Sequence, residues 1–191
     1  MKLELFYPLK PFQTTQKFGE NLNGFYRELG MLGHNGIDMV GNTGQTIYAA
    51  HDGVVTFTGE DGSGGLGVVV RTTELFEWNG EFHNFKSIYW HCLPNSFKVK
   101  PGDIVKAGTP LAQCDSTGKV TGPHLHFGIK PMLQGDSDYE WIPSVLENGY
   151  KGAIDPQPFF NGYYAVDAQV VQKILATLKE LLQKAISLFT K

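Results

Sequence analysis

The chain has few cysteines, no long apolar run and no excess of basic residues, and each absence excludes a class of protein. Its two cysteines, Cys92 and Cys114, are too few to indicate a disulfide framework. The sequence contains no stretch of about 20 apolar residues, the length that a membrane-spanning helix needs. The formal net charge of −3 provides no basic surface for DNA or RNA. We therefore expect neither a transmembrane protein nor a nucleic-acid-binding protein.

The first ten residues also lack the pattern of a secretory signal. Such a signal needs an apolar core of about 7–15 residues. Here Lys2, Glu4 and Pro8 interrupt the apolar residues too early. If the protein acts outside the cell, we expect another route of delivery: a phage lysin, a virion-mounted enzyme, or a mature form whose leader has been removed.

The composition of the 191-residue chain fits one folded domain with an appendage. Hydrophobic residues make up 41% of the sequence and aromatic residues 13%, enough to bury one sizeable core. Between residues 46 and 129, short β-branched and aromatic runs alternate with turn residues such as Asp52 and Gly53. This alternation predicts a mainly β, antiparallel domain. The expected strands are 46–50, 53–58, 67–72, 85–92, 111–114 and 123–129.

The pattern changes after residue 129. Residues 139–143 and 150–160 are rich in aromatic residues and proline, which predicts an irregular segment that wraps the β domain. From 166 to 190 apolar residues recur at spacings of three and four, which predicts an amphipathic helix. Its apolar face could dock on a second copy or a partner, pack on its own domain, or lie on a membrane surface. The expected division is a domain over 1–163 and a helical tail over 164–191.

Two histidines one residue apart, His124 and His126, are the most informative feature of the chain. If residues 123–129 form a strand, both side chains point to the same face and start about 6.6 Å apart. They can therefore serve one site. Strand geometry alone does not say which of the two reaches a metal ion.

A second pair lies upstream, where His34 and Asp38 stand four residues apart among small residues that permit a tight turn. Imidazole and carboxylate groups both bind zinc, at about 2.0–2.2 Å. Two histidines and one aspartate would leave one position of a tetrahedron open. An open position is typical of a catalytic zinc rather than a structural one.

With these motifs the sequence resembles the lysostaphin-like zinc metallopeptidases, the LytM or beta-lytic group, which cut the peptide part of bacterial peptidoglycan. The resemblance covers roughly residues 12–130 and weakens towards residue 160. The matching pieces, in order, are QKFG (16–19), GHNGID (33–38), IYAAHDGVV (47–55), IYWH (88–91), VKPGDIVKAG (99–108), STG (116–118) and TGPHLHF (121–127).

The resemblance implies a barrel-sandwich catalytic domain with a duplicated hybrid motif. It also implies a Zn²⁺ ion bound by His34, Asp38 and His126, with His124 as general base and His91 as a second catalytic histidine. We expect His91 to donate to the oxyanion of the tetrahedral intermediate. Three residues depart from the family pattern without removing a ligand or a base, and they bear on substrate fit: Trp90, Cys92 and Gly128.

The expected function is therefore that of a hydrolase, a zinc metalloprotease that cuts peptidoglycan stem peptides or cross-bridges and faces the cell wall. One alternative is a non-catalytic barrel scaffold, such as a phage tail component. Another is a cysteine-based wall amidase using Cys92, which is disfavoured because no helix N-terminus or positive surroundings are indicated there. The glycine turns around residues 102 and 108 also resemble biotinyl and lipoyl carrier domains, which lack these histidines.

The remaining candidates are interpreted as structural. His51 and His83 are expected to be solvated loop residues, and Cys92 a small buried apolar residue. Residues 62–67 match the G-x-G-x-x-G spelling of a dinucleotide site, but a strand-like Val-Val-Val run follows where that site needs a helix. We interpret these glycines as a loop that borders the cleft.

Overall fold

The computed structural model describes residues 1–133 and 147–164, together with residues 177, 178 and 182. The expected segment 139–143 and almost all of the expected helix over 166–190 lie outside these residues, so both stay predictions. Among the described residues, no helix is both long and apolar enough to cross a bilayer.

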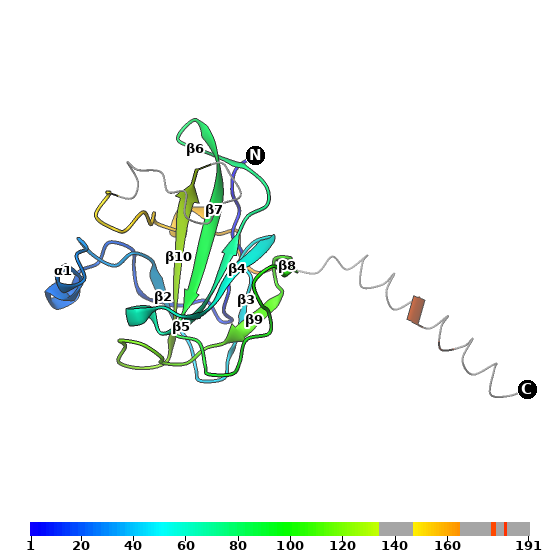
Figure 1. Cartoon of the computed structure of the whole chain (residues 1–191), viewed down its shortest axis with the longest axis horizontal. Helices are drawn as coiled ribbons and strands as arrows, with labels where there is room; N and C mark the ends of the chain where they lie inside the picture. Colours follow the sequence, from blue (N-terminus) through cyan, green and yellow to red (C-terminus); the bar gives the residue numbers. More distant parts are fainter. Residues whose placement is uncertain (134–146, 165–176, 179–181, 183–191) are drawn as a thin grey trace, which may run out of the picture.

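The described part of the chain is mainly antiparallel β-sheet, as the sequence predicts (Figure 1). One large sheet has the order β1-β2-β10-β7-β5-β4-β8, with β6 paired to β7, and β3 pairs with β9 in a second sheet. The strands are β1 (Thr14–Gln16), β2 (Ile37–Val40), β3 (Thr46–Tyr48), β4 (Gly53–Glu60), β5 (Leu66–Arg71), β6 (Phe76–Trp78), β7 (Glu81–Trp90), β8 (Ile104–Val105), β9 (Pro110–Gln113) and β10 (His124–Met132). The helices are short: α1 (Phe25–Glu28) and the 3₁₀ turns η1 (Leu22–Gly24), η2 (Gly62–Gly64) and η3 (Gln157–Phe159).

All six expected strands are present, and four more are found. The additional strands, β1, β2, β6 and β8, have two to four residues each. Such short strands carry too few alternating positions to be recognised from their own sequence. Asp38, which the sequence places among small residues that permit a tight turn, lies on β2.

The two faces of β10 have different roles. Leu125, Phe127 and Ile129 are fully buried in the hydrophobic core. Because side chains alternate along a strand, His126 and Lys130 point to the opposite face, where both line a cleft. The sheet thus holds the core on one side and forms the floor of the cleft on the other.

The described part of the aromatic segment packs on the β domain. Leu5 pairs with Phe160 in a parallel bridge, and Ile129 of β10 pairs with Ile154 in an antiparallel one. Tyr7 packs against Phe160 with ring centroids 5.0 Å apart. Residues 150–160 therefore extend the core rather than start a second one, while the boundary at residue 163 stays a prediction.

Candidate metal centre

The sheet brings the two sequence motifs together. His126 on β10 and Asp38 on β2 are directly opposite each other in the strand register. His34 lies in the loop that leads into β2. A Cβ atom at Gly36 would lie 2.5 Å from the Phe127 carbonyl oxygen, so the loop can pass this close to β10 only because residue 36 is glycine.

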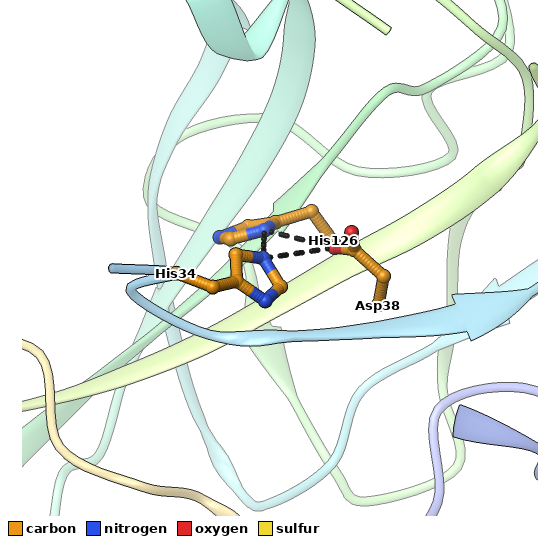
Figure 2. Close-up of side chains that lie close together, drawn as sticks. All are labelled: His34, Asp38 and His126. Atoms are coloured by element: carbon orange, nitrogen blue, oxygen red, sulfur yellow. Dashed lines mark hydrogen bonds and ion pairs between the residues drawn. The ribbon is translucent and has the colours of Figure 1, made fainter. Parts of the chain in front are cut away.

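Three potential metal ligands converge at this point, as Figure 2 shows. The His34 Nε2 and His126 Nδ1 atoms are 2.8 Å apart, and each lies 3.1 Å from Asp38 Oδ1. Donor atoms bound tetrahedrally to one zinc ion at about 2.0–2.1 Å lie about 3.3 Å from each other. Two imidazole nitrogens and a carboxylate oxygen at these separations fit Zn²⁺.

The charge states also fit a metal ion. Burial alone would raise the pKa of the Asp38 carboxyl, but its hydrogen bonds with His126 and His34 outweigh this and hold the pKa well below its usual range. Burial lowers the pKa of His126 despite the neighbouring Asp38. An ionised carboxylate and a neutral imidazole are the forms in which these side chains bind metals.

Backbone carbonyl groups hold three of the histidine rings at their Nδ1 atoms. His34 Nδ1 lies 3.2 Å from the Lys17 oxygen, His124 Nδ1 lies 2.9 Å from the Gly122 oxygen, and His91 Nδ1 lies 2.7 Å from the Thr117 oxygen. A neutral ring that donates its Nδ1 proton to a carbonyl keeps a free lone pair on Nε2. The three Nε2 atoms are thereby prepared to bind a metal or accept a proton.

His124 and His91 lie beside the three potential ligands. His124 Nε2 is 3.6 Å from Asp38 Oδ2, and the His124 and His91 ring centroids are 4.6 Å apart. Burial lowers the pKa of His91 to about 4, more than its hydrogen bond to Thr117 raises it, so the ring is neutral near pH 7. All five residues expected from the sequence are therefore in one cluster.

Sequence reasoning missed Tyr26 and Thr117. The Tyr26 ring packs against His34 with centroids 5.4 Å apart, and its hydroxyl donates to Gln16 Oε1. Besides holding His91, Thr117 donates its hydroxyl to the Cys92 carbonyl and accepts from Leu66 N–H. Tyr26 belongs to none of the quoted motifs, whereas Thr117 lies in the quoted STG piece, to which no role was assigned.

The cleft above this cluster has a volume of about 970 Å³. One wall comes from residues 22–31 and another from the glycine-rich turn at 61–64, the second of which the sequence predicts as a border of the cleft. In the β6–β7 hairpin, Lys86, Ile88 and Trp90 line the cleft, whereas the distal part, residues 76–85, contributes no described lining residue. Its histidine instead packs against the far end of β10.

The predictions for the two other histidines are wrong. His51 is 4% exposed, with Nδ1 2.8 Å from the Asp52 carbonyl oxygen and Nε2 2.8 Å from Ser87 Oγ. His83 is 5% exposed on β7, with Nδ1 3.1 Å from the Met132 carbonyl oxygen. Both rings are buried and hydrogen-bonded to residues that are distant in sequence, Ser87 for His51 and Met132 for His83. The local sequence does not reveal these partners.

The prediction for Cys92 is confirmed. Its side chain is fully buried, and burial raises the pKa of its thiol to about 12. A thiol of this kind is protonated near neutral pH and is a poor nucleophile. Cys92 and Cys114 are free thiols opposite each other in an isolated bridge.

Comparison with known proteins agrees with this geometry. The sequence profile of peptidase family M23 matches residues 32–137, which include all five clustered residues. The chain belongs to peptidase family M23. Its strand-rich fold is that of the family, and the donor set fits the zinc ion on which this family depends.

Two curated relatives and one solved structure illustrate the similarity. The chain is 37% identical to the glycyl-glycine endopeptidase ALE-1 of Staphylococcus capitis over 68% of this chain and 34% of ALE-1. It is 31% identical to the peptidoglycan DD-endopeptidase ShyB of Vibrio cholerae over 50% of this chain and 20% of ShyB. The structure of LytU superposes with a TM-score of 0.55 at 30% identity, covering 78% of this chain and 85% of LytU. The chain thus spans about a third or less of these two curated relatives.

Proposed function

We propose that this chain is the catalytic unit of a zinc-dependent peptidoglycan endopeptidase that acts at the cell wall. The observation that supports this most is the convergence of His34, Asp38 and His126 next to two further histidines in one open cleft. The names of the relatives support peptidoglycan peptides as substrates.

In this proposal His34, Asp38 and His126 hold the metal ion. Bound zinc polarises a peptide carbonyl group and lowers the pKa of water from 15.7 toward about 7. The residues around it orient the peptide and move protons. The positions of two of the three proposed ligands follow from the strand register, because Asp38 and His126 face each other on neighbouring strands.

His124 is the proposed general base. The Gly122 carbonyl accepts its Nδ1 proton, so Nε2 is the basic atom, and this atom lies on the metal side of the ring beside Asp38. Nε2 can accept a proton from the attacking water and deliver it to the leaving amine. Removing His124 should abolish hydrolysis without removing a metal ligand.

His91 is the proposed second catalytic histidine. Because its Nδ1 atom donates to the Thr117 carbonyl, its Nε2 atom is an acceptor while the ring is neutral. It becomes a donor to the oxyanion only after it has taken up a proton. The expected donor role would need a proton that the neutral ring lacks, so in this proposal His91 Nε2 instead accepts a hydrogen bond from the attacking water.

The test combines metal analysis with lysis of purified peptidoglycan. We expect one zinc per chain in the wild type, loss of zinc and lysis in Asp38→Ala, and loss of lysis with zinc retained in His124→Ala. Glu77→Ala, at an exposed carboxylate on β6, is the matched control and should behave as wild type. Wild-type protein with a full zinc complement that leaves cell walls and bridge peptides uncut would overturn the proposal and favour a scaffold.

A further inference from the structure

The sheet face that carries the metal ligands also carries a row of cations. Lys130 on β10 is directly opposite Lys86 on β7, and Lys86 is opposite Arg71 on β5. Lys130 lies four residues after His126, so the alternation of the strand places both on the same face. Lys86 and Lys130 line the same cleft as the metal ligands, and so does Lys151.

The separation between the two features matches a short peptide. Four residues along a strand correspond to about 13 Å, which is also the length of roughly four residues of an extended substrate. The floor between them is apolar, with Ile88 and Val69 lining the cleft. A peptide lying along β10 over this floor would reach the lysines about four residues from the bond at the metal.

The lysines are close enough to affect one another. The pKa of Lys130 is lowered to about 8, first by burial and then by the positive charges of Lys86 and Lys151, and the opposing effect of Asp61 is smaller. Two neighbouring lysines thus contribute positive charge around Lys130, and Glu60 and Asp61 contribute negative charge elsewhere in the same cleft lining. A carboxylate placed here would relieve the repulsion between the lysines and form charge-assisted hydrogen bonds with them.

We propose that Lys86, Lys130 and Lys151 form a subsite for a carboxylate group of the substrate peptide, about four residues from the bond that is cut. This inference rests on the proposed function and specifies its substrate class. The carboxylate comes either from the C-terminus of a stem peptide or from the side chain of a diamino dicarboxylic acid. The middle of an oligoglycine bridge offers no such group.

The test measures binding separately from cleavage. Two pairs of peptides are titrated against zinc-loaded His124→Ala protein, which is not expected to cut them, by calorimetry. One pair differs only in a C-terminal acid or amide, the other only in a free or amidated side-chain carboxylate. We expect the acid member of at least one pair to bind roughly tenfold or more tightly, with the difference shrinking at high salt.

Variants then test whether the preference for the acid peptide depends on these lysines. Lys86→Gln combined with Lys151→Gln should reduce the preference for the acid to about threefold or less. Lys119→Gln, a lysine in another part of the cleft lining, is the matched control and should keep the preference. Zinc content and thermal midpoint verify that each variant is folded.

Each outcome separates this subsite from the proposed function. Equal binding of acid and amide in both pairs, no binding of any peptide, or an unchanged preference in the double variant would overturn the subsite. If the acid preference is present but wild-type protein cuts no peptide, the subsite stands and the proposed catalysis fails.

Discussion

At the scale of single residues, the site depends on one strained backbone conformation. His91 directly follows β7 and has a φ of 68°, in the left-handed region that residues other than glycine rarely adopt. Such a conformation costs on the order of 1–3 kcal/mol. Continuing the strand would point His91 into the core, whereas the turn brings its ring against His124 and its Nδ1 atom against the Thr117 carbonyl.

His51 should make the stability of the protein depend on pH. Burial lowers its pKa in the folded state, whereas the unfolded state has the ordinary value of about 6.5. As pH falls below about 6.5 the unfolded state binds more protons, so the free energy of unfolding decreases. We expect His51→Gln to be less stable by about 1–2 kcal/mol at pH 7.5, because buried hydrogen bonds are lost.

The difference in free energy of unfolding between the wild type and His51→Gln should become smaller as the pH falls to 5.5. Only the wild type loses the stability that a neutral His51 contributes. Urea denaturation at pH 7.5, 6.5 and 5.5 measures it. The histidines of the metal centre contribute to both proteins, so their effect cancels in the comparison. A difference that stays constant over this range would contradict the assignment.

At this scale the sequence was most informative about which side chains could bind a metal ion. It was least informative about which side chains are buried and what they contact. His34, Asp38, His124 and His126 were recognisable because imidazole and carboxylate groups at these spacings can bind a metal. The division of roles between His124 and His126 came only from the resemblance. The burial of His51 depends on Ser87, 36 residues away, and no local pattern carries that information.

At the scale of secondary structure elements, the pairing of β5 with β7 requires a glycine under Trp90. Gly67 and Trp90 are opposite each other, and a Cβ atom at Gly67 would lie 1.7 Å from Trp90 Cε3. The indole therefore lies across the strand that carries Gly67. From there it contributes to the lining of the cleft.

Gly67→Ala should consequently destabilise the protein by about 1–3 kcal/mol, because the indole must move. In a Trp90→Ala background the cost should be smaller, though not zero, since the Tyr89 carbonyl oxygen would still lie 2.7 Å from the new Cβ. Chemical denaturation of the four proteins gives the coupling energy between the two positions.

Gly122→Ala is the matched control, because no atom lies within 4 Å of its added Cβ. It should change the free energy of unfolding by less than about 0.5 kcal/mol. If Gly67→Ala lowers the free energy of unfolding by no more than this control does, Trp90 does not pack closely against Gly67.

The longer strands could be predicted from sequence because each has enough alternating positions to show its period. β2 could not, since its four residues follow a glycine-containing loop that resembles a turn. Yet β2 carries Asp38. The element that carries a proposed metal ligand was thus among those with the weakest signal of their own.

At the scale of the whole molecule, the candidate metal centre joins parts of the chain that are far apart in sequence. Asp38 and His126 are 88 residues apart, and they meet only when β2 and β10 pair. A metal ion that binds the folded state alone stabilises that state by mass action, by about 4 kcal/mol at a concentration 1,000 times its dissociation constant.

Zinc removal should therefore lower the thermal midpoint of the wild type by roughly 10 °C, given about 2–4 °C per kcal/mol for a protein of this size. Calorimetry with and without a chelator measures the change. His126→Ala should show little response to the chelator, because it lacks one ligand. An equal response in both proteins would place the metal elsewhere.

The overall topology was only partly accessible from the sequence. Strand runs and turn residues predicted an antiparallel β domain, but the order β1-β2-β10-β7-β5-β4-β8 depends on contacts between distant segments. The packing of residues 1–9 against residues 154–162 illustrates this, because nothing in the sequence indicates what the leucines of the first segment pack against.

That packing also determines how the folded body responds to a mechanical pull. The segments around Leu5 and Phe160 run in the same direction, with Leu5 N–H donating to the Phe159 carbonyl and Asn161 N–H donating to the Leu5 carbonyl. A force that draws residue 1 and residue 164 apart loads these bonds in shear, all at once, instead of opening them one by one. These bonds therefore resist such a force before it reaches the strands that hold the histidines.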